Sequence, residues 1–156
     1  MSQENVEIVR RISEAFEAGV ERGDFTAAWE TGAVAEDSVQ LATKLIGTPD
    51  DNVMNGTVGN DFFNGLAGDD VLNGGPGDDA FRFSAGFGQD IVVGFTAGAA
   101  GDDVIEFAGV FSGFDEVLAA SHQVGSNVII EADDENGVAL IDVALASLNQ
   151  DDFRFV

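Results

Sequence analysis

A nine-residue unit repeats in tandem in the middle of the chain, and this period constrains the fold more than any other feature. Read from residue 47, the four units are GTPDDNVMN, GTVGNDFFN, GLAGDDVLN and GGPGDDAFR. Every unit has glycine first, aspartate or asparagine sixth and a large apolar residue eighth, and three units have glycine fourth. A fixed period predicts an architecture in which each unit forms the same local structure.

Each repeated position has a physical reason. Glycine allows a tight turn that exposes backbone carbonyls. The eighth-position residues Met54, Phe63, Leu72 and Phe81 lie in short extended segments and are expected to enter a core. One unit then forms one loop and one short strand, and two units form one turn of a solenoid. Loops eighteen residues apart are therefore expected to stack along the same edge.

Stacked loops of this composition bring hard oxygen ligands together. The sixth-position side chains supply carboxylates, and the turns supply carbonyls. Calcium takes six to eight oxygen ligands at roughly 2.3–2.6 Å, whereas magnesium prefers to keep its waters. The pattern therefore predicts calcium sites between facing loops. A flexible glycine-rich linker is the alternative, but a linker does not keep large apolar residues in register.

The units resemble the pattern GGxGxDxUx of the repeats-in-toxin (RTX) calcium-binding family, and the resemblance extends over about residues 47–156. It implies a mainly β fold, in which a parallel β-roll solenoid over residues 46–95 continues into a β-sandwich. It also implies that positions two, four and six of one loop bind the same ion as positions one, three and six of the loop eighteen residues further on.

Carried onto this chain, the family pattern implies two to three calcium ions. The first set of ligands is Thr57, Gly59 and Asp61 with Gly74, Pro76 and Asp79. The second, shifted by two residues, is Leu66, Gly68 and Asp70 with Ala85, Phe87 and Asp90. The third is Thr48, Asp50 and Asn52 with Gly65, Ala67 and Asp70. The third set should bind more weakly because Asp50 replaces a glycine and Asn52 an aspartate. Asp102 and Asp103 are further candidates beside Gly75, Gly77 and Asp79, whereas Asn60, Asp69 and Asp78 are expected to face solvent.

Residues 1–45 are predicted to be a separate helical segment, because Val9, Ile12, Phe16 and Val20 form an apolar stripe at helical spacing. The segment MSQENVEIVRRISEAFEAGVERGDFTAAWE resembles the opening helices of SnoaL-like proteins of the NTF2-like superfamily. The long strands of that fold do not follow, so no pocket or catalytic residue is carried over. We expect a helical cap on the open end of the solenoid; a partly ordered extension is the alternative.

The remainder, about residues 91–156, is predicted to be β structure with one helix at Asp115–Ala120. The run AFRFSAGFGQDIVVGFTAGAAGDDVIEFAG and the ending LASLNQDDFRFV resemble the C-terminal half of RTX modules in secreted bacterial proteases, lipases and alginate epimerases. The resemblance implies a β-sandwich and an uncleaved C-terminal signal for the type I secretion machinery. Phe153, Phe155 and Val156 are equally compatible with a final strand, and both interpretations can hold.

The acidic composition excludes some partners and predicts a conditional fold. The net charge is −23, with six basic against 29 acidic residues, which argues against nucleic acid and anionic membrane surfaces. Rows of stacked aspartates repel one another unless a cation is bound. The absence of cysteine excludes disulfides. No apolar run is long enough for a membrane span, and the N-terminus lacks a signal-peptide pattern, so we expect export without a cleaved signal.

The sequence indicates no catalytic centre. His122 is the single histidine, which excludes an HExxH zinc site, and GxSxG and P-loop motifs are absent. The prediction is a secreted, extracellular bacterial module that folds on calcium binding and is not an enzyme. Three alternatives stay open: a carbohydrate- or protein-binding module at the cell surface, a helper module of a polysaccharide-modifying enzyme, and a SnoaL-like enzyme remnant.

Overall fold

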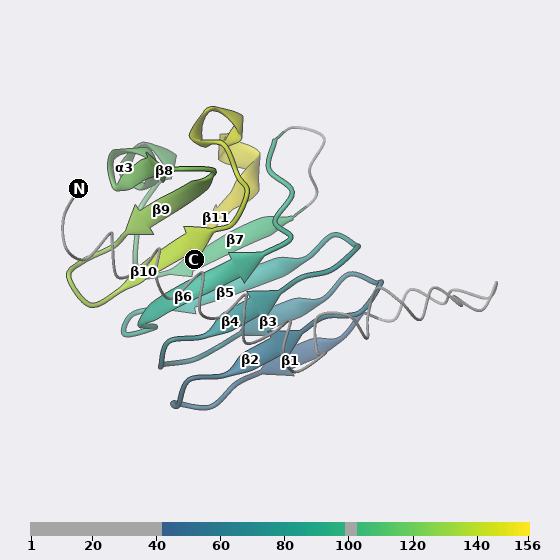
Figure 1. The fold of residues 1–156 in the computed structure, drawn as a ribbon. Helices are drawn as coiled ribbons and strands as arrows, with labels where there is room; N and C mark the ends of the chain where they lie inside the picture. Colours follow the sequence, from purple (N-terminus) through teal and green to yellow (C-terminus); the bar gives the residue numbers. More distant parts are fainter. Residues whose placement is uncertain (1–41, 99–102) are drawn as a thin grey trace. The chain divides into compact units, whose positions relative to one another are not determined.

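The chain forms two facing β-sheets that it enters alternately, as Figure 1 shows. The computed structural model describes residues 42–98 and 103–156. The predicted N-terminal helices and any pocket lined by residues 1–41 lie outside the described residues. Among the described residues, no helix combines the length and apolar character needed to cross a membrane.

The first sheet contains five strands, and every neighbouring pair in it is parallel. In spatial order they are β1 (Lys44–Ile46), β3 (Phe62–Asn64), β5 (Ala80–Ser84), β7 (Val104–Ala108) and β11 (Phe153–Phe155). The second sheet has six strands, in the order β2 (Val53–Asn55), β4 (Val71–Asn73), β6 (Gln89–Val93), β10 (Gly137–Leu140), β9 (Asn127–Glu131) and β8 (Ser121–Val124). Its first four strands are parallel, and β9 and β8 add antiparallel pairings.

The predicted β-roll is confirmed by the way the short strands stack. Strands β1 to β6 alternate between the sheets, and the middle residue of each of β2, β3 and β4 faces inward. Phe63 and Phe81 are fully buried, and their rings stack at a centroid distance of 4.9 Å. Met54 and Leu72 are aligned and buried in the opposite sheet. The eighth position of each unit therefore builds the core, since extended chain points alternate side chains to opposite faces.

The C-terminal part closes the far end of the roll. The helix α3 (Phe114–Ala119) begins after the extended Gly113, close to the predicted start, and buries Val117. Strands β9 and β10 form a hairpin whose turn is held by the carboxylate of Asp133, which accepts bonds from the backbone N–H groups of Glu135 and Asn136. Two short 3-10 helices, η1 (Leu145–Ser147) and η2 (Gln150–Asp152), lead into β11.

One predicted boundary differs from the structure. The first strand begins at Lys44, inside the segment predicted to be helical as far as residue 45. This strand precedes the first glycine of the repeat, so the nine-residue pattern does not mark it. It pairs with β3 in the same register that relates later coils, with Leu45 aligned with Phe63. The roll therefore starts two residues before the predicted limit at residue 46.

Candidate metal centre

The sixth-position side chains lie in two rows, one on each edge of the roll. On the edge where the chain passes from the second sheet to the first, Asp61 Oδ1 accepts a 2.8 Å bond from the backbone N–H of Thr43. Asp79 Oδ1 accepts from Asp61 N–H at 2.8 Å, and Asp103 Oδ1 from Asp79 N–H at 2.7 Å. The three aspartates are buried. The fold therefore brings together Asp61 and Asp79, as the first predicted ligand set requires.

The opposite edge carries the second row. Asp70 Oδ1 accepts from Asn52 N–H at 2.8 Å, and Asp90 Oδ1 accepts from Asp70 N–H at 2.8 Å. The second interval is 20 residues instead of 18, in agreement with the two-residue shift expected from the sequence. Asp70 thus lies between Asn52 and Asp90. This position is the one expected of a residue that belongs to both the second and the third ligand sets.

Backbone carbonyls lie between the stacked loops. A Cβ on Gly77 would lie 2.3 Å from the carbonyl oxygen of Gly59, and a Cβ on Gly88 would lie 2.2 Å from that of Gly68. Gly77 and Gly88 also have φ values of 144° and 93°, which favour glycine. The fourth-position glycines therefore permit adjacent coils to stack closely with their carbonyls facing the neighbouring loop.

The remaining predicted ligands divide into two groups. Carbonyl oxygens of the first group face a glycine of the neighbouring coil: Asp50, Thr57, Gly65 and Gly74. The second group lies in the same loops, and its role as carbonyl ligands stays a prediction: Thr48, Leu66, Ala67, Pro76, Ala85 and Phe87. The ring of Phe87 is itself buried and packs against Phe83 at 5.2 Å.

Among the residues that the structure describes, two buried carboxylate oxygens have no hydrogen-bond partner: Asp70 Oδ2 and Asp79 Oδ2. Burial raises the pKa of Asp79 to about 6, although the N–H of Asp61 stabilises its charged form; the charges of Asp103, Asp61 and Asp78 raise the pKa further. Burial also raises the pKa of Asp70 and of Asp103. A buried carboxylate with an unsatisfied oxygen is costly unless a proton or cation compensates it.

This donor set fits calcium. Over residues 42–98 and 103–156, no three acidic or histidine side chains converge on a common point. A site here would combine pairs of carboxylates with backbone carbonyls, which are the oxygen ligands that calcium accepts. Bound calcium would neutralise the carboxylates and cross-link adjacent coils.

The fifth-position side chains form a second ladder that the sequence analysis missed. Asp51 Oδ1 accepts from Asp69 N–H at 2.9 Å, and Asp69 Oδ1 accepts from Gln89 N–H at 2.9 Å. On the other edge, Asn60 Oδ1 accepts from Asp78 N–H at 3.1 Å. Asn60 and Asp78 are exposed as predicted, but Asp69 is half-buried. The sequence contains a signal for this ladder, because every unit has aspartate or asparagine at its fifth position.

Asp103 ends the first row and differs from Asp79, whose Oδ2 has no partner. Its Oδ2 accepts from Thr96 N–H at 2.8 Å, so both of its oxygens have backbone donors. Nearby in the chain, Gly98 N–H donates to the buried Asp152 at 2.9 Å. The predicted proximity of Asp103 to Asp79 is confirmed, whereas Asp102 lies outside the described residues. The bond from Gly98 to Asp152 links this part of the roll to the C-terminal part of the chain.

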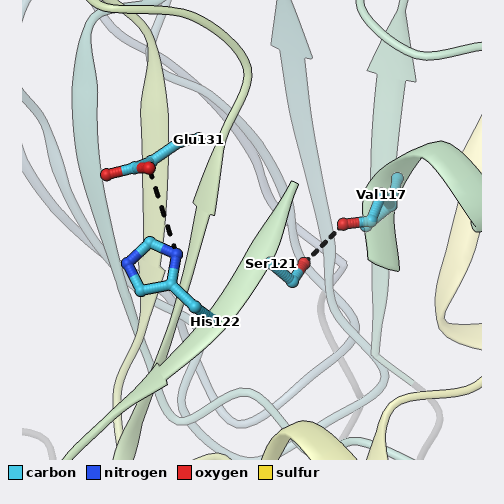
Figure 2. Close-up of polar contacts among 4 residues, drawn as sticks. All are labelled: Val117, Ser121, His122 and Glu131. Carbon is cyan, nitrogen blue, oxygen red and sulfur yellow. Dashed lines mark hydrogen bonds and ion pairs between the residues drawn. The ribbon is translucent and has the colours of Figure 1, made fainter. Parts of the chain in front are cut away.

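His122 belongs to a separate structural cluster, shown in Figure 2. Its Nδ1 lies 4.0 Å from a carboxylate oxygen of Glu131 on the neighbouring strand. The adjacent Ser121 hydroxyl donates to the carbonyl of Val117 at 2.6 Å. The two contacts connect β8 to β9 and to α3. This geometry supports a structural role for His122.

Comparison with known proteins agrees with the geometry. The fold is a parallel β-roll, and its stacked turns present carboxylates and carbonyls of the kind that calcium accepts. Residues 46–81 match the family model of the RTX calcium-binding nonapeptide repeat, in four copies. Among solved structures, the chain is similar to the extracellular lipase LipA from Serratia marcescens, with a TM-score of 0.58 and 25% sequence identity over 72% of this chain and 21% of that one. The chain thus spans about a fifth of the lipase's length. A search of curated proteins found no match.

Proposed function

We propose that this chain is a non-catalytic module that binds two to three calcium ions at the predicted ligand sets and folds as they bind. The observation that carries the proposal is the pair of buried, unpartnered carboxylate oxygens of Asp70 and Asp79 within an RTX β-roll. These oxygens oppose folding in the absence of a cation. Calcium ligation therefore contributes directly to the free energy of folding.

The proposal includes secretion through a type I system, with folding completed outside the cell. The structural neighbour is an extracellular protein, and the C-terminal sequence resembles the secretion region of RTX modules. In the folded chain Asp152 is buried and Phe153–Phe155 forms β11, paired with β7. A signal in this segment is accessible before the strand forms. Low cytosolic calcium keeps the chain in that state until export.

A second candidate function is the binding of an anionic carbohydrate or protein. Lys44, Arg82 and Arg154 are the basic side chains of residues 42–98 and 103–156, and all three occupy outward positions on the first sheet. Arg82 pairs with Glu106 at 3.2 Å, and Lys44 lies over the ring of Phe62 at 5.8 Å. The chain as a whole is strongly acidic, whereas this face carries basic side chains. For this reason we retain the binding of an anionic partner as a second candidate function.

Far-UV circular dichroism of the full chain tests the proposed function. The chain is first placed in chelator and then titrated with calcium to about 10 mM, the upper range for extracellular calcium modules. We expect a calcium-dependent gain of β signal and a higher thermal midpoint. Magnesium at the same concentrations is the control and should have little effect. A chain that is fully folded in chelator, with a midpoint unaffected by calcium, would contradict the proposal.

Export requires a separate test. The full chain and a variant lacking residues 152–156 are expressed in a bacterial host with a type I exporter. We expect the full chain in the medium and the truncated variant in the cells. An Arg154→Gln variant changes one exposed side chain but keeps the terminal segment, so it is the matched control and should be exported like the full chain. Equal export of the truncated variant would place the signal elsewhere.

A further inference from the structure

The four loops of the repeat block fall into two conformational classes, distinguished by their second residue. The first two loops have Thr48 and Thr57 at this position, and neither threonine has a positive φ. The next two have Leu66 at φ 80° and Gly75 at φ 85°. Leu66 is one of two non-glycine residues with positive φ among the described residues, and this conformation is unfavourable for leucine.

In the second loop, threonine satisfies the sixth-position carboxylate from within the loop. Both the N–H and the hydroxyl of Thr57 donate to Asp61 Oδ2. The same hydroxyl accepts a 3.1 Å bond from Gly59 N–H. Because Asp61 Oδ1 already accepts from Thr43 N–H, both carboxylate oxygens have donors supplied by the protein.

The first loop closes in the same way around an amide. Thr48 N–H donates to Asn52 Oδ1 at 2.6 Å, and Asn52 Nδ2 donates back to the Thr48 hydroxyl at 3.0 Å. This reciprocal pair leaves the loop without a formal charge at its sixth position. The replacement of aspartate by asparagine here is therefore part of a complete hydrogen-bonded arrangement.

The third and fourth loops, in which the second residue has a left-handed backbone conformation, lack this closure; we call them the left-handed loops. Leu66 N–H donates to Asn64 Oδ1 at 3.2 Å and not to Asp70. Asp70 is 0% exposed and Asp79 is 1% exposed, and the Oδ2 atom of each has no partner. The second positions of these loops carry no hydroxyl, since they are leucine and glycine. Two independent features, left-handed backbone and an unsatisfied buried oxygen, thus coincide in the same two loops.

We infer that the second residue of each loop determines whether that loop requires calcium. Threonine loops close without a cation, and the loops of Asp70 and Asp79 provide the dominant calcium ligands. The inference rests on the proposed calcium-dependent function. It differs from the repeat pattern, which gives all sixth positions equivalent roles. It also makes Asp61 a minor contributor to affinity, although Asp61 belongs to the ligand set expected to be best formed.

Calcium binding by the full chain, measured by equilibrium dialysis and titration calorimetry, tests the inference with two matched variants. Asp79→Asn removes a charge from a left-handed loop, and Asp61→Asn removes one from a threonine loop. We expect D79N to lose one bound ion or to weaken its binding by at least about tenfold, and D61N to change affinity by less than about threefold. Circular dichroism at saturating calcium verifies that both variants are folded.

A reciprocal exchange of the second residue provides an independent readout in chelator. Leu66→Thr should close the third loop, raise the thermal midpoint in chelator and weaken calcium binding. Thr57→Gly should open the second loop, lower that midpoint and enlarge the rise on calcium addition. Leu66 is 43% exposed, so its replacement leaves the core intact. Val58→Thr, at a site that is 47% exposed, is the control for an apolar-to-threonine change outside the second position.

The outcomes separate this inference from the proposed function. If the chain binds calcium but D61N and D79N lose affinity equally, the loops are equivalent and the inference is wrong. It is also wrong if L66T behaves as V58T does in chelator and in calcium binding. If the unmodified chain binds no calcium, the proposed function itself fails, and the inference fails with it.

Discussion

Asp79 joins the backbone of two coils and is the residue where folding and charge conflict most directly. Its Oδ1 accepts from the N–H of Asp61, and its own N–H donates to Asp103. Its Oδ2 is buried without a partner, and its pKa is raised from 3.8 to about 6, chiefly by burial. In chelator, a proton is the remaining ligand that can relieve this cost.

This pKa predicts an unusual pH dependence in chelator. Because the folded state binds the proton more tightly than the unfolded state, the stabilisation is complete below pH 3.8 and is lost as pH rises through about 6. Asp79 alone contributes up to about 3 kcal/mol over this window. Asp70 and Asp103 shift in the same direction. Urea unfolding between pH 7.5 and 5 should therefore show increasing stability.

The control for this prediction is D79N, in which the pH dependence should be smaller because a titrating group is lost. With calcium present, affinity should instead decrease toward pH 5, since protons compete for the same oxygens. Stability in chelator that falls steadily from pH 7.5 to 5 would contradict the assignment.

At the scale of strands, most of the packing is concentrated in the inward residue of each coil. Phe81 is fully buried in the core, where its ring stacks on that of Phe63 at 4.9 Å and lies 6.2 Å from that of Phe95. Phe81→Ala should lower the free energy of unfolding at saturating calcium by about 3–5 kcal/mol. Phe62→Ala, on the outward face, is the control and should cost markedly less. Urea unfolding measures both, and equal losses would contradict the predicted packing.

The strands of the repeat were predictable from the sequence because the nine-residue period and the apolar eighth position of each unit together locate them. Phe63 and Leu72 were expected in the core from the eighth position alone, and both are fully buried. Lys44–Ile46 was missed because three residues outside the repeat carry no periodic signal. The pairing of β10 between β6 and β9 depends on contacts between distant segments, so local alternation could not give it.

The site was partly predictable for the same reason. Spacing correctly indicated that Asp61 meets Asp79 and that Asp70 meets both Asn52 and Asp90. It could not indicate which carboxylate oxygen lacks a partner, because that depends on the backbone angle of Leu66 and on a hydroxyl at Thr57. Hydrogen bonding within each loop, and not the repeat itself, distinguishes the members of a row.

At the scale of the whole molecule, the net charge of −23 predicts that salt and calcium act differently. Monovalent salt screens exposed carboxylates such as Asp51 and Asp78. It should raise the thermal midpoint in chelator without reproducing the calcium effect, because Asp70 and Asp79 are buried from the ionic atmosphere. Midpoints measured in chelator at low and at about 0.5 M sodium chloride, each with and without calcium, test this. Full replacement of calcium by sodium chloride would contradict it.

The alternation of single units between the two sheets determines what a change in the number of repeats does to the molecule. Inserting one nine-residue unit would transfer every later strand to the opposite sheet, although β10 would still pair with β6 and β11 with β7. Inserting two units restores the side of each strand and adds one complete layer. An even number of added repeats therefore keeps the C-terminal part in the same relation to the sheets of β1 and β2. An odd number of added repeats exchanges the two sheets for the C-terminal part, so that β10 continues the sheet of β1 and β11 the sheet of β2.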